Sequence, residues 1–412
     1  MNSTGKLVRE SAFNRKRIAV LGAGIMGSSV ALFLARKGVE VTLIDAAPRP
    51  FSGASRWNEG KIHLGYLYSA DPTLESARAL LPGGLAFKSL VEELIGSSID
   101  NATTRENDLY LVNRKSVVDA AAMRRYFDTV AQLVRSHPAA KNYLVDVSHS
   151  RIEPLSRQEL GSLVDTQEIV AGFRVPERSV STLWVADRYV DALSDEPRIA
   201  LCMGTKVLGI VPKDTLGHWQ VSTEPAPAGT FDFVVNTLWE GRLAVDATLG
   251  LKPEPGWSHR YRLSLFVRTS RNLSVPSAVI AVGPFGDIKN YNSQEFYLSW
   301  YPAGLIAEGH SILPPSRPSL DDADRDEISA AIARGLCRVL APAGAVVEAA
   351  DCTMLGGGWV FALGKGALDD PAATIHRRDR FGIRRYGSYI SVDTGKYSIA
   401  PWIARRLVEE IG

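Results

Sequence analysis

A glycine-rich turn near the start of the chain constrains its fold more than any other feature. The apolar run Arg17–Leu21 has the composition of a buried strand, and residues 28–37 have that of a helix. Three glycines with the spacing G-x-G-x-x-G stand between them: Gly22, Gly24 and Gly27. The first permits a tight bend, the second lets the backbone approach a pyrophosphate, and the third lets the helix pack closely on the strand. The pattern predicts a strand–turn–helix unit that binds a dinucleotide.

An acidic residue ends the second strand of this unit. Residues 39–44 have the composition of that strand, and Asp45 follows them, 21 residues beyond Gly24. Its carboxylate can accept hydrogen bonds from ribose hydroxyls. The start of the helix offers free N–H groups and the positive end of its dipole to phosphates. These features do not distinguish FAD from NAD.

Length and composition set broad limits. A chain of 412 residues, with 45% hydrophobic and 22% charged residues, is typical of a globular protein with two domains. The net charge of +2 is too small to indicate binding to nucleic acid or to an anionic membrane. No apolar stretch is long enough to span a bilayer. Residues 1–15 lack the apolar segment of a secretory signal, so we expect a frayed extension there.

Cysteine and histidine usage argues against disulfides and metal centres. The three cysteines, Cys202, Cys337 and Cys352, are scattered and form no C-x-x-C pair. This usage predicts a reducing, cytoplasmic location. The seven histidines show no metal-ligand spacing, so we predict no bound metal.

A long loop, residues 46–68, follows Asp45 and leaves the sheet at the edge where doubly wound folds bind ligands. Its segment 53–65 reads G-A-S-R-W-N-E-G-K-I-H-L-G. Together with the opening unit, this segment resembles the FAD-dependent oxidoreductases of the D-amino-acid oxidase superfamily. Members of that superfamily include glycine and sarcosine oxidases, glycerol-3-phosphate dehydrogenases and L-2-hydroxyglutarate dehydrogenases. The resemblance implies FAD as the cofactor, with the loop running along the flavin ring.

The resemblance also implies an architecture. It indicates an α/β protein in which a discontinuous, Rossmann-type FAD-binding domain is joined to an α+β substrate domain with an antiparallel sheet. We assign the FAD-binding domain to residues 1–95, 160–240 and 350–412, and the substrate domain to residues 96–159 and 241–349.

Two glycine-rich segments are predicted to be loops or to lead into one. Residues 283–294 are rich in glycine and asparagine and lie between segments that have the composition of strands. Gly356–Gly358 is predicted to precede a long loop.

The resemblance implies cofactor contacts in the glycine turn, the following loop, a middle strand and a turn near the C-terminus. The terminal turn, residues 394–399, would face the flavin pyrimidine, and Val207 would pair with the adenine. The family usually has an Ala-Ala-Gly-like turn where this chain has Thr237-Leu238-Trp239-Glu240-Gly241. The predicted FAD contacts are Gly22, Ala23, Gly24, Met26, Gly27, Asp45, Ala46, Ser55, Arg56, Gly60, Lys61, Ile62, Val207, Thr394, Gly395, Lys396, Tyr397, Ser398 and Ile399.

Three residues are the predicted catalytic groups: His63, Tyr301 and Lys396. An unperturbed histidine titrates near pH ~6.5, which suits it to remove an alcohol proton. The alternative for His63 is a buried histidine that only packs or bonds to the backbone. Tyr301, in S-W-Y-P, resembles an aromatic residue of the sarcosine-oxidase-like members.

A carboxylate substrate would favour an arginine fork or a tyrosine hydroxyl. Arg260 and Arg262 share one face of a predicted strand because strand side chains alternate. The further candidates are Tyr291, Arg384 and Arg385.

The predicted reaction is oxidation of a C–N bond in a small amine or amino-acid-like substrate, by hydride transfer to flavin N5. No second G-x-G-x-x-G exists for NAD(P)H, so oxygen or an electron carrier is the expected acceptor. One alternative is C–O oxidation of a 2-hydroxy acid or polyol phosphate, which K-I-H-x-G favours. A flavin-binding or assembly protein without turnover is the other. The oligomeric state stays open.

Overall fold

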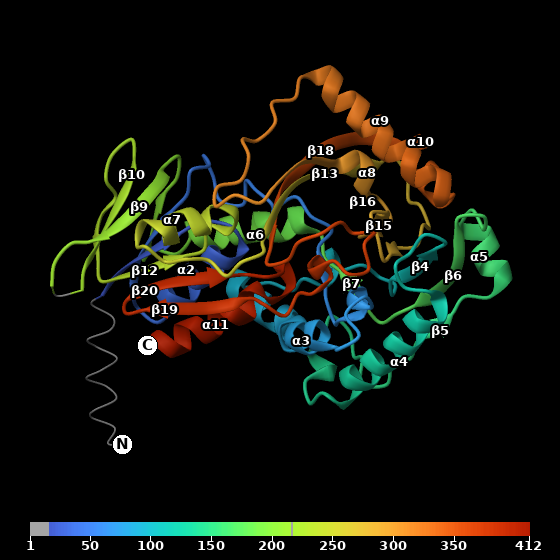
Figure 1. The fold of residues 1–412 in the computed structure, drawn as a ribbon, viewed down its shortest axis with the longest axis horizontal. Coiled ribbons are helices and arrows are strands. Elements are labelled where there is room, and N and C mark those ends of the chain that lie inside the picture. The colour runs from blue at the N-terminus through green and yellow to red at the C-terminus, as the bar shows by residue number, and fades with distance from the viewer. Residues whose placement is uncertain (1–15, 216) are drawn as a thin grey trace.

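The computed structural model describes residues 16–215 and 217–412. Within them, a mostly parallel six-stranded sheet and a mostly antiparallel nine-stranded sheet organise the structure. Figure 1 shows the first sheet with α11 on the left and the second, covered by α9, on the right. The extension expected at residues 1–15 lies outside the described residues.

The six-stranded sheet has the order β19-β20-β12-β1-β2-β8, in which the β19–β20 pair is antiparallel and the other pairs are parallel. The central strand is buried from Ile18 to Leu21, because the apolar run is covered on both faces. This sheet confirms the predicted Rossmann-type fold class. Its strands are β1 (Arg17–Leu21), β2 (Glu40–Ile44), β8 (Ile199–Cys202), β12 (Phe233–Asn236), β19 (Gly382–Tyr386) and β20 (Tyr389–Asp393).

Three helices pack beside this sheet: α2 (Ile25–Arg36), α3 (Glu75–Ile95) and α11 (Ala400–Ile411). Two glycines of α3 are needed for its close packing on the loops of the site. A Cβ at Gly84 would lie 2.0 Å from the carbonyl oxygen of His63, and one at Gly83 would lie 2.5 Å from the Ile399 side chain. The helix therefore supports both the loop after β2 and the turn before α11.

The nine-stranded sheet has the order β17-β13-β16-β15-β14-β4-β6-β5, and β18 pairs with β13. Its helices α9 and α10 pack together at its end, and apolar residues of α9, β13 and β16 share one core. The strands are β4 (Leu109–Asn113), β5 (Glu153–Pro154), β6 (Ile169–Arg174), β13 (Ser258–Thr269), β14 (Ala278–Ala281), β15 (Gly286–Asn290), β16 (Glu295–Trp300), β17 (Leu305–Gly309) and β18 (Ala350–Ala362).

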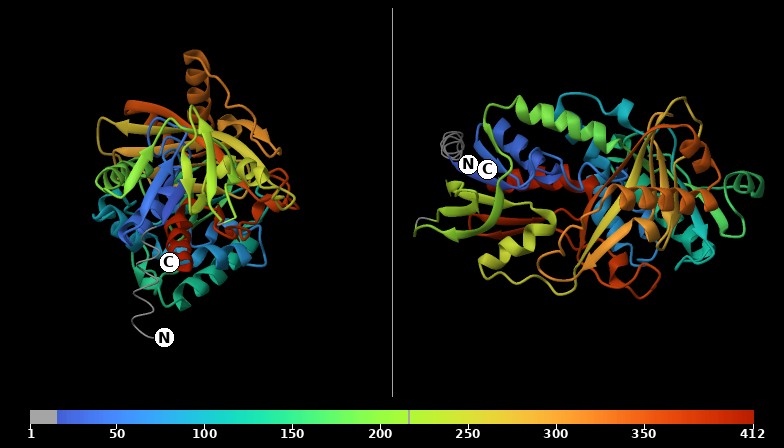
Figure 2. Two further views of the ribbon diagram at one scale, coloured as in Figure 1. Left: turned by 90° about the vertical axis from the view of Figure 1, so that its left-hand side faces the viewer. Right: turned by 90° about the horizontal axis from the view of Figure 1, so that it is seen from above.

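Two smaller sheets complete the fold. A three-stranded sheet of β9, β10 and β11 lies beside the parallel sheet, as Figure 2 shows from above, and β3 pairs with β7. These strands are β3 (Lys61–Ile62), β7 (Arg178–Ser179), β9 (Lys206–Pro212), β10 (Trp219–Glu224) and β11 (Gly229–Phe231). The remaining helices are α4 (Ala120–Ser136), α5 (Arg157–Leu163), α6 (Thr182–Ser194), α7 (Arg242–Thr248), α8 (Tyr301–Gly304), α9 (Asp322–Val339) and α10 (Pro342–Glu348).

Strand pairing divides the chain differently from the predicted domain ranges. We assigned residues 160–240 and 350–412 to the FAD-binding domain, yet β6 and β18, which lie in these ranges, pair in the nine-stranded sheet. The reason is non-local: β6 bonds to β4, and β18 follows β13 along its whole length. Neither partner can be read from local sequence.

One predicted loop contains a strand, and the other glycine-rich segment lies in a strand that is followed, as predicted, by an irregular segment, residues 363–373. β15 lies within residues 283–294, where it is held between β14 and β16. Gly356–Gly358 lies inside β18. A Cβ at Gly358 would meet the Ala54 amide nitrogen at 2.7 Å, so the glycines let the loop after β2 pack directly on this strand.

Among the described residues, no helix is long and apolar enough to cross a membrane.

Candidate cofactor and active site

The turn before α2 has the shape of an anion-binding site. Gly22 adopts φ +98°, and a Cβ at Gly27 would lie 1.8 Å from the Gly22 carbonyl oxygen. The helix begins without a side-chain cap and without an acidic residue in its first turn. The Ile25 amide donates to Ser55 Oγ at 3.0 Å, which brings the loop after β2 to the helix start. First-turn N–H groups and the helix dipole favour a phosphate at such a place.

Asp45 braces this turn. Its Oδ2 accepts a hydrogen bond from the Ala23 amide at 2.7 Å, and its Oδ1 accepts one from the Ala47 amide at 2.8 Å. Each carboxylate oxygen can accept a second bond, so the half-buried side chain stays suited to ribose hydroxyls. Ala46 is exposed beside it, and Met26 is buried in α2.

The turn that departs from the family pattern places a second acid near Asp45. Burial and the Asp45 charge raise the pKa of Glu240 to about 7. Trp239 adopts φ +53° and donates its indole N–H to the Trp359 carbonyl at 2.8 Å. The departure therefore changes the side chains that follow β12 without disturbing the pairing of β1 with β12.

The turn before α11 offers a second group of unsatisfied polar atoms. Gly395 adopts φ +64°, and its amide donates to Asp393 Oδ1 at 3.0 Å. A 3₁₀ turn over Tyr397–Ile399 then leads into the helix. The Tyr397 hydroxyl and Ser398 Oγ are buried without a hydrogen-bond partner. Buried polar atoms are rarely left unpaired, so these atoms fit the edge of a bound ring system.

The described residues thus fit both ends of the FAD molecule. The α2 turn and Asp45 suit the pyrophosphate and ribose, and the 394–399 turn suits the flavin. Val207 lies on β9, which follows directly after the segment that bonds to the Asp45 backbone. Arg56 pairs with Asp187 at 2.8 Å, and its Nε is free for another acceptor. The described residues contain no cluster of side chains that could hold a metal.

The loop that carries His63 is fixed by a buried carboxylate. Glu177 Oε1 accepts hydrogen bonds from the amides of Leu64 at 2.6 Å and Gly65 at 3.1 Å. The Tyr143 hydroxyl donates to the Ile62 carbonyl at 2.6 Å. These contacts hold residues 61–65 in one conformation beside α3.

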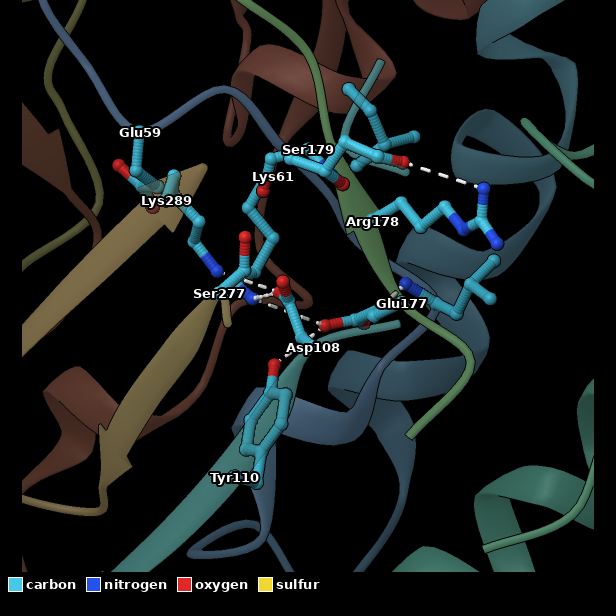
Figure 3. Close-up of polar contacts among 12 residues, drawn as sticks. Glu59, Lys61, Asp108, Tyr110, Glu177, Arg178, Ser179, Ser277 and Lys289 are labelled. Atoms are coloured by element: carbon cyan, nitrogen blue, oxygen red, sulfur yellow. Dashed lines mark hydrogen bonds and ion pairs between the residues drawn. The ribbon is translucent and has the colours of Figure 1, made fainter. Parts of the chain in front are cut away.

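Figure 3 shows a buried ion-pair cluster, which we define as Lys61, Asp108, Glu177 and Lys289. Asp108 accepts from Lys61 in a very short contact and from Lys289 at 2.6 Å. Glu177 lies 3.7 Å from Lys61 and accepts from the Tyr110 hydroxyl at 2.5 Å. The two lysines and two carboxylates balance, so the cluster is a neutral unit inside the protein.

The pKa values in the ion-pair cluster follow from burial and pairing. Burial lowers the pKa of Lys289 to about 8, although the Asp108 charge opposes the shift. The charges of Asp108 and Glu177 outweigh burial at Lys61 and raise its pKa. Burial opposes ionisation of Asp108, but both lysines outweigh it and lower its pKa. Lys61 therefore has its ammonium engaged by carboxylates.

His63 is neutral in this setting. Its side chain is 2% exposed, and its Nδ1 has no hydrogen-bond partner. Burial, followed by the charges of Lys396, Lys61 and Lys289, holds the pKa of His63 well below its usual value. The ring packs on Tyr68 with 5.4 Å between ring centroids. His63 can accept a hydrogen bond, but it is a weak base.

Four basic side chains lie near one another, and we call Arg260, Arg262, Arg378 and Lys396 the cationic cluster. Arg260 donates to the Tyr301 hydroxyl at 3.0 Å, and the Arg262 guanidinium lies over the Tyr301 ring, 4.6 Å from its centroid. Burial and the charge of Arg378 lower the pKa of Lys396 to about 7. Burial and the charge of Arg260 lower the pKa of Arg378 to about 10.

The structure thus brings most of the proposed catalytic and carboxylate-binding residues together. Lys396 is close enough to perturb His63, and Arg260 joins Tyr301. The Tyr291 hydroxyl donates to the Glu59 carbonyl at 3.1 Å. Arg384 and Arg385 lie elsewhere, on β19, and Arg384 contacts Glu254 at 2.5 Å.

Sequence reasoning missed Arg378, Glu59, Glu177 and Lys289. Arg378 lies in an irregular segment, where no periodicity indicates its direction. The other three take their roles from contacts between distant segments. Only a charged residue within a buried strand, such as Lys289 in β15, could have indicated a buried partner of opposite charge.

Comparison with known proteins agrees with this geometry. The model of the DAO family, described as FAD dependent oxidoreductase, matches residues 17–360. A glycine oxidase from Geobacillus kaustophilus superposes with a TM-score of 0.67 at 14% identity, covering 96% of this chain and 95% of that one. An L-alpha-glycerophosphate oxidase from Mycoplasma pneumoniae, solved with FAD bound, gives 0.63 at 14% identity and 96% and 94% coverage. An iminodiacetate oxidase from Chelativorans sp. BNC1 gives 0.62 at 16% identity and 95% and 94% coverage.

A shorter similarity concerns one segment. Fifty-one residues are 47% identical to kynurenine 3-monooxygenase of Salinispora tropica, and this match spans 12% of the chain and 11% of that enzyme. The family match covers most of the chain, and the solved structures share its fold over 95–96% of its length. The chain therefore belongs to the DAO family of FAD-dependent oxidoreductases.

Proposed function

We propose that the protein oxidises a C–N bond in a small amine or amino-acid-like substrate, and that oxygen or an electron carrier reoxidises the cofactor. The observation that carries the proposal is the position of neutral His63 and the cationic cluster next to the turn expected at the flavin. FAD bound there supplies the hydride acceptor. We also propose a cytoplasmic location, which the absence of disulfides among the described cysteines supports.

The depressed pKa of His63 favours an amine over an alcohol. An alcohol must lose a poorly acidic proton as its C–H bond is broken, and this needs a base whose pKa lies near the working pH. His63 lies well below that range. An amine needs only to lose its ammonium proton before oxidation. Nearby positive charges lower the pKa of an ammonium group, so the cationic cluster favours the neutral amine.

The cationic cluster also orients an acidic substrate. Guanidinium groups bind carboxylates through two parallel hydrogen bonds, which fixes both position and direction. Arg260 and Arg262 come from one strand, so their relative position is set by β13 and its pairing with β18. The Tyr301 hydroxyl is oriented by Arg260 and can donate its own proton to a substrate oxygen. We propose binding roles for Tyr301 and Lys396 and a hydrogen-bond-accepting role for His63.

The second candidate is oxidation of a 2-hydroxy acid or polyol phosphate. The unpartnered Nδ1 of His63 favours it, since this atom can accept a proton from a substrate hydroxyl. The fold does not decide between the two, because its structural neighbours include both a glycine oxidase and a glycerophosphate oxidase.

Anaerobic reduction of the bound flavin tests the proposal. The purified protein, reconstituted with FAD, is mixed without oxygen with a panel of amines, amino acids, 2-hydroxy acids and polyol phosphates. Loss of the yellow colour with an amine or amino acid, and not with hydroxy compounds, is expected. Reduction by hydroxy compounds alone would establish the second candidate. A protein that binds FAD and is reduced by no member would leave only the non-catalytic alternative.

A further inference from the structure

The cationic cluster forms no direct ion pair, unlike the buried lysines of the ion-pair cluster and buried Arg242. In the ion-pair cluster each lysine contacts Asp108, and buried Arg242 contacts Asp393 at 3.0 Å. None of the four members of the cationic cluster forms an ion pair with a carboxylate of the described residues. Buried charges are normally paired or bound to a ligand. The missing partner is therefore expected to be a molecule that binds there.

Two carboxylates lie near enough to offset part of this charge. The charges of Lys396 and Arg262, together with a backbone hydrogen bond, outweigh burial at Glu59 and lower its pKa, so Glu59 is ionised. Burial and the Glu59 charge raise the pKa of Asp287, which accepts a very short hydrogen bond from Ser299. With both carboxylates ionised, the three arginines still exceed them by one positive charge, and Lys396 adds to this excess when it is protonated.

The excess charge is concentrated at Arg260 and Arg378. Both lie near Tyr301, and the charge of Arg260 contributes to lowering the pKa of Arg378. The carboxylate of Asp393 acts on Arg378, but it is already engaged by Arg242. Glu59 and Asp287 act on Arg262 instead. A single carboxylate on the substrate would therefore leave one cationic centre unpaired.

The arginine geometry indicates two separate anionic groups. The Nε atoms of both Arg260 and Arg262 are buried without a hydrogen-bond partner. Nε and a terminal nitrogen form the edge of a guanidinium that binds a carboxylate in a fork. Arg260 donates to the hydroxyl of Tyr301, and Arg262 lies over its ring. The two guanidinium groups, which we call the Arg260 and Arg262 forks, therefore lie at different parts of the Tyr301 side chain. Arg262 and Arg378 are only half-buried, which leaves them accessible to a ligand.

We infer that the substrate is a small dicarboxylate, whose two carboxylates are bound by the Arg260 and Arg262 forks with Arg378 and Lys396 completing the charge balance. The inference rests on the proposed function for the identity of the site, and it narrows the substrate to amino-dicarboxylates. A monocarboxylic amine has a single carboxylate, which can bind to only one of the two forks. A phosphate ester concentrates its charge at one point and leaves the second fork unpaired.

The inference is tested by equilibrium binding to the oxidised holoenzyme, followed by the change in the visible flavin spectrum. The probes are unreactive acids of equal chain length, glutarate and valerate, together with inorganic phosphate. Glutarate is expected to bind about tenfold or more tightly than valerate, because one additional charged hydrogen-bonding pair is formed. Phosphate is expected to bind more weakly than glutarate. Valerate or phosphate binding as tightly as glutarate would overturn the inference.

Variants assign the effect to the forks. Arg260→Gln and Arg262→Gln are each expected to reduce the glutarate preference to about threefold or less, with valerate binding changed less than glutarate binding. Arg384→Gln, outside the cluster, is the matched control and is expected to keep the preference. FAD content and thermal unfolding verify that each variant is folded. An unchanged preference in both cluster variants would overturn the assignment.

The same preparation separates this inference from the proposed function. If an amine reduces the flavin but glutarate binds no better than valerate, the dicarboxylate inference fails and the function stands. If glutarate binds preferentially but only hydroxy acids reduce the flavin, the C–N proposal fails and the dicarboxylate site stands.

Discussion

Replacing Asp108 by asparagine removes one charge from the ion-pair cluster while keeping the shape of the side chain. Asp108 is 0% exposed and is the carboxylate that contacts both Lys61 and Lys289. After the substitution, Lys61 keeps Glu177 at 3.7 Å, whereas Lys289 loses its ion-pair partner. Removing one partner of a buried ion pair costs about 3–5 kcal/mol. We expect a loss of this size in the free energy of unfolding at about pH 6.

The size of the loss depends on pH through Lys289. In the wild type its pKa is about 8, already below the ordinary lysine value because of burial. Without Asp108 this pKa falls further, since the attraction is lost and the repulsion from Lys61 remains. A lysine with a lowered pKa in the folded state destabilises the protein at low pH, where the unfolded chain binds the proton. The loss in free energy of unfolding relative to the wild type therefore shrinks by up to about 1.4 kcal/mol per pH unit as the pH rises. This continues until about pH 8, where Lys289 of the wild type begins to titrate as well.

Urea unfolding of the apoprotein, followed by tryptophan fluorescence at about pH 6 and about pH 8.5, measures both effects. Asp100→Asn is the control, because Asp100 is 63% exposed and pairs with Lys88 at the surface. It is expected to cost less than about 1 kcal/mol at both pH values. A loss below about 1 kcal/mol in Asp108→Asn, or a loss that does not shrink as the pH rises, would refute this reasoning.

Four further predictions concern the cofactor turn and the site. Gly27→Val pushes α2 away from Gly22, because even a Cβ there would lie 1.8 Å from the Gly22 carbonyl oxygen; the folded protein should purify without FAD, and a yellow variant would contradict the predicted pyrophosphate site. Glu177→Gln weakens the acceptor for the amides of Leu64 and Gly65, so these amides should exchange hydrogen faster while α9 amides do not; unchanged exchange would contradict its anchoring role. The pKa of His63 lies well below its usual value, so the pH profiles of flavin reduction in the wild type and in His63→Asn should be alike near pH ~6.5. A step near this pH that the variant lacks would show that His63 titrates there. The pKa of Lys396 is about 7, so glutarate binding should weaken with rising pH above about 7 and lose this dependence in Lys396→Met; the same dependence in the variant would assign it to another group.

The parts of the fold that local sequence specifies were predictable. Glycine spacing, the apolar run and Asp45 identified β1, α2 and β2, because each signal acts within one supersecondary unit. The pairing of β4 with β14, which joins β4–β6 to the strands of residues 258–309, was not predictable. Such pairings depend on contacts across more than a hundred residues, which no local period encodes. β15 was concealed for a related reason: its glycine and asparagine are tolerated because neighbours on both sides supply its hydrogen bonds.

The candidate site divides in the same way. The two-residue period of a strand placed Arg260 and Arg262 on one face, and the structure shows both at Tyr301. The ion-pair cluster could not be predicted, since Lys61 and Lys289 are 47 and 181 residues from Asp108 along the chain. Arg378 was missed because an irregular segment carries no pattern of direction. His63 was predicted either as a base titrating near neutral pH or as a buried histidine that only packs, and burial with three nearby lysines lowers its pKa well below the usual value.

The rate of flavin reduction by a matched pair of substrates tests the central claim most directly. An amino-dicarboxylate and the 2-hydroxy-dicarboxylate of the same carbon skeleton are each mixed anaerobically with the FAD-loaded protein, and the loss of visible flavin absorbance is followed. Both compounds satisfy the cationic cluster, so a difference in rate reports on the bond that is oxidised. We predict that the amino compound reduces the flavin at least about tenfold faster, since His63 is too weak a base to assist an alcohol. Faster reduction by the hydroxy compound would contradict the account.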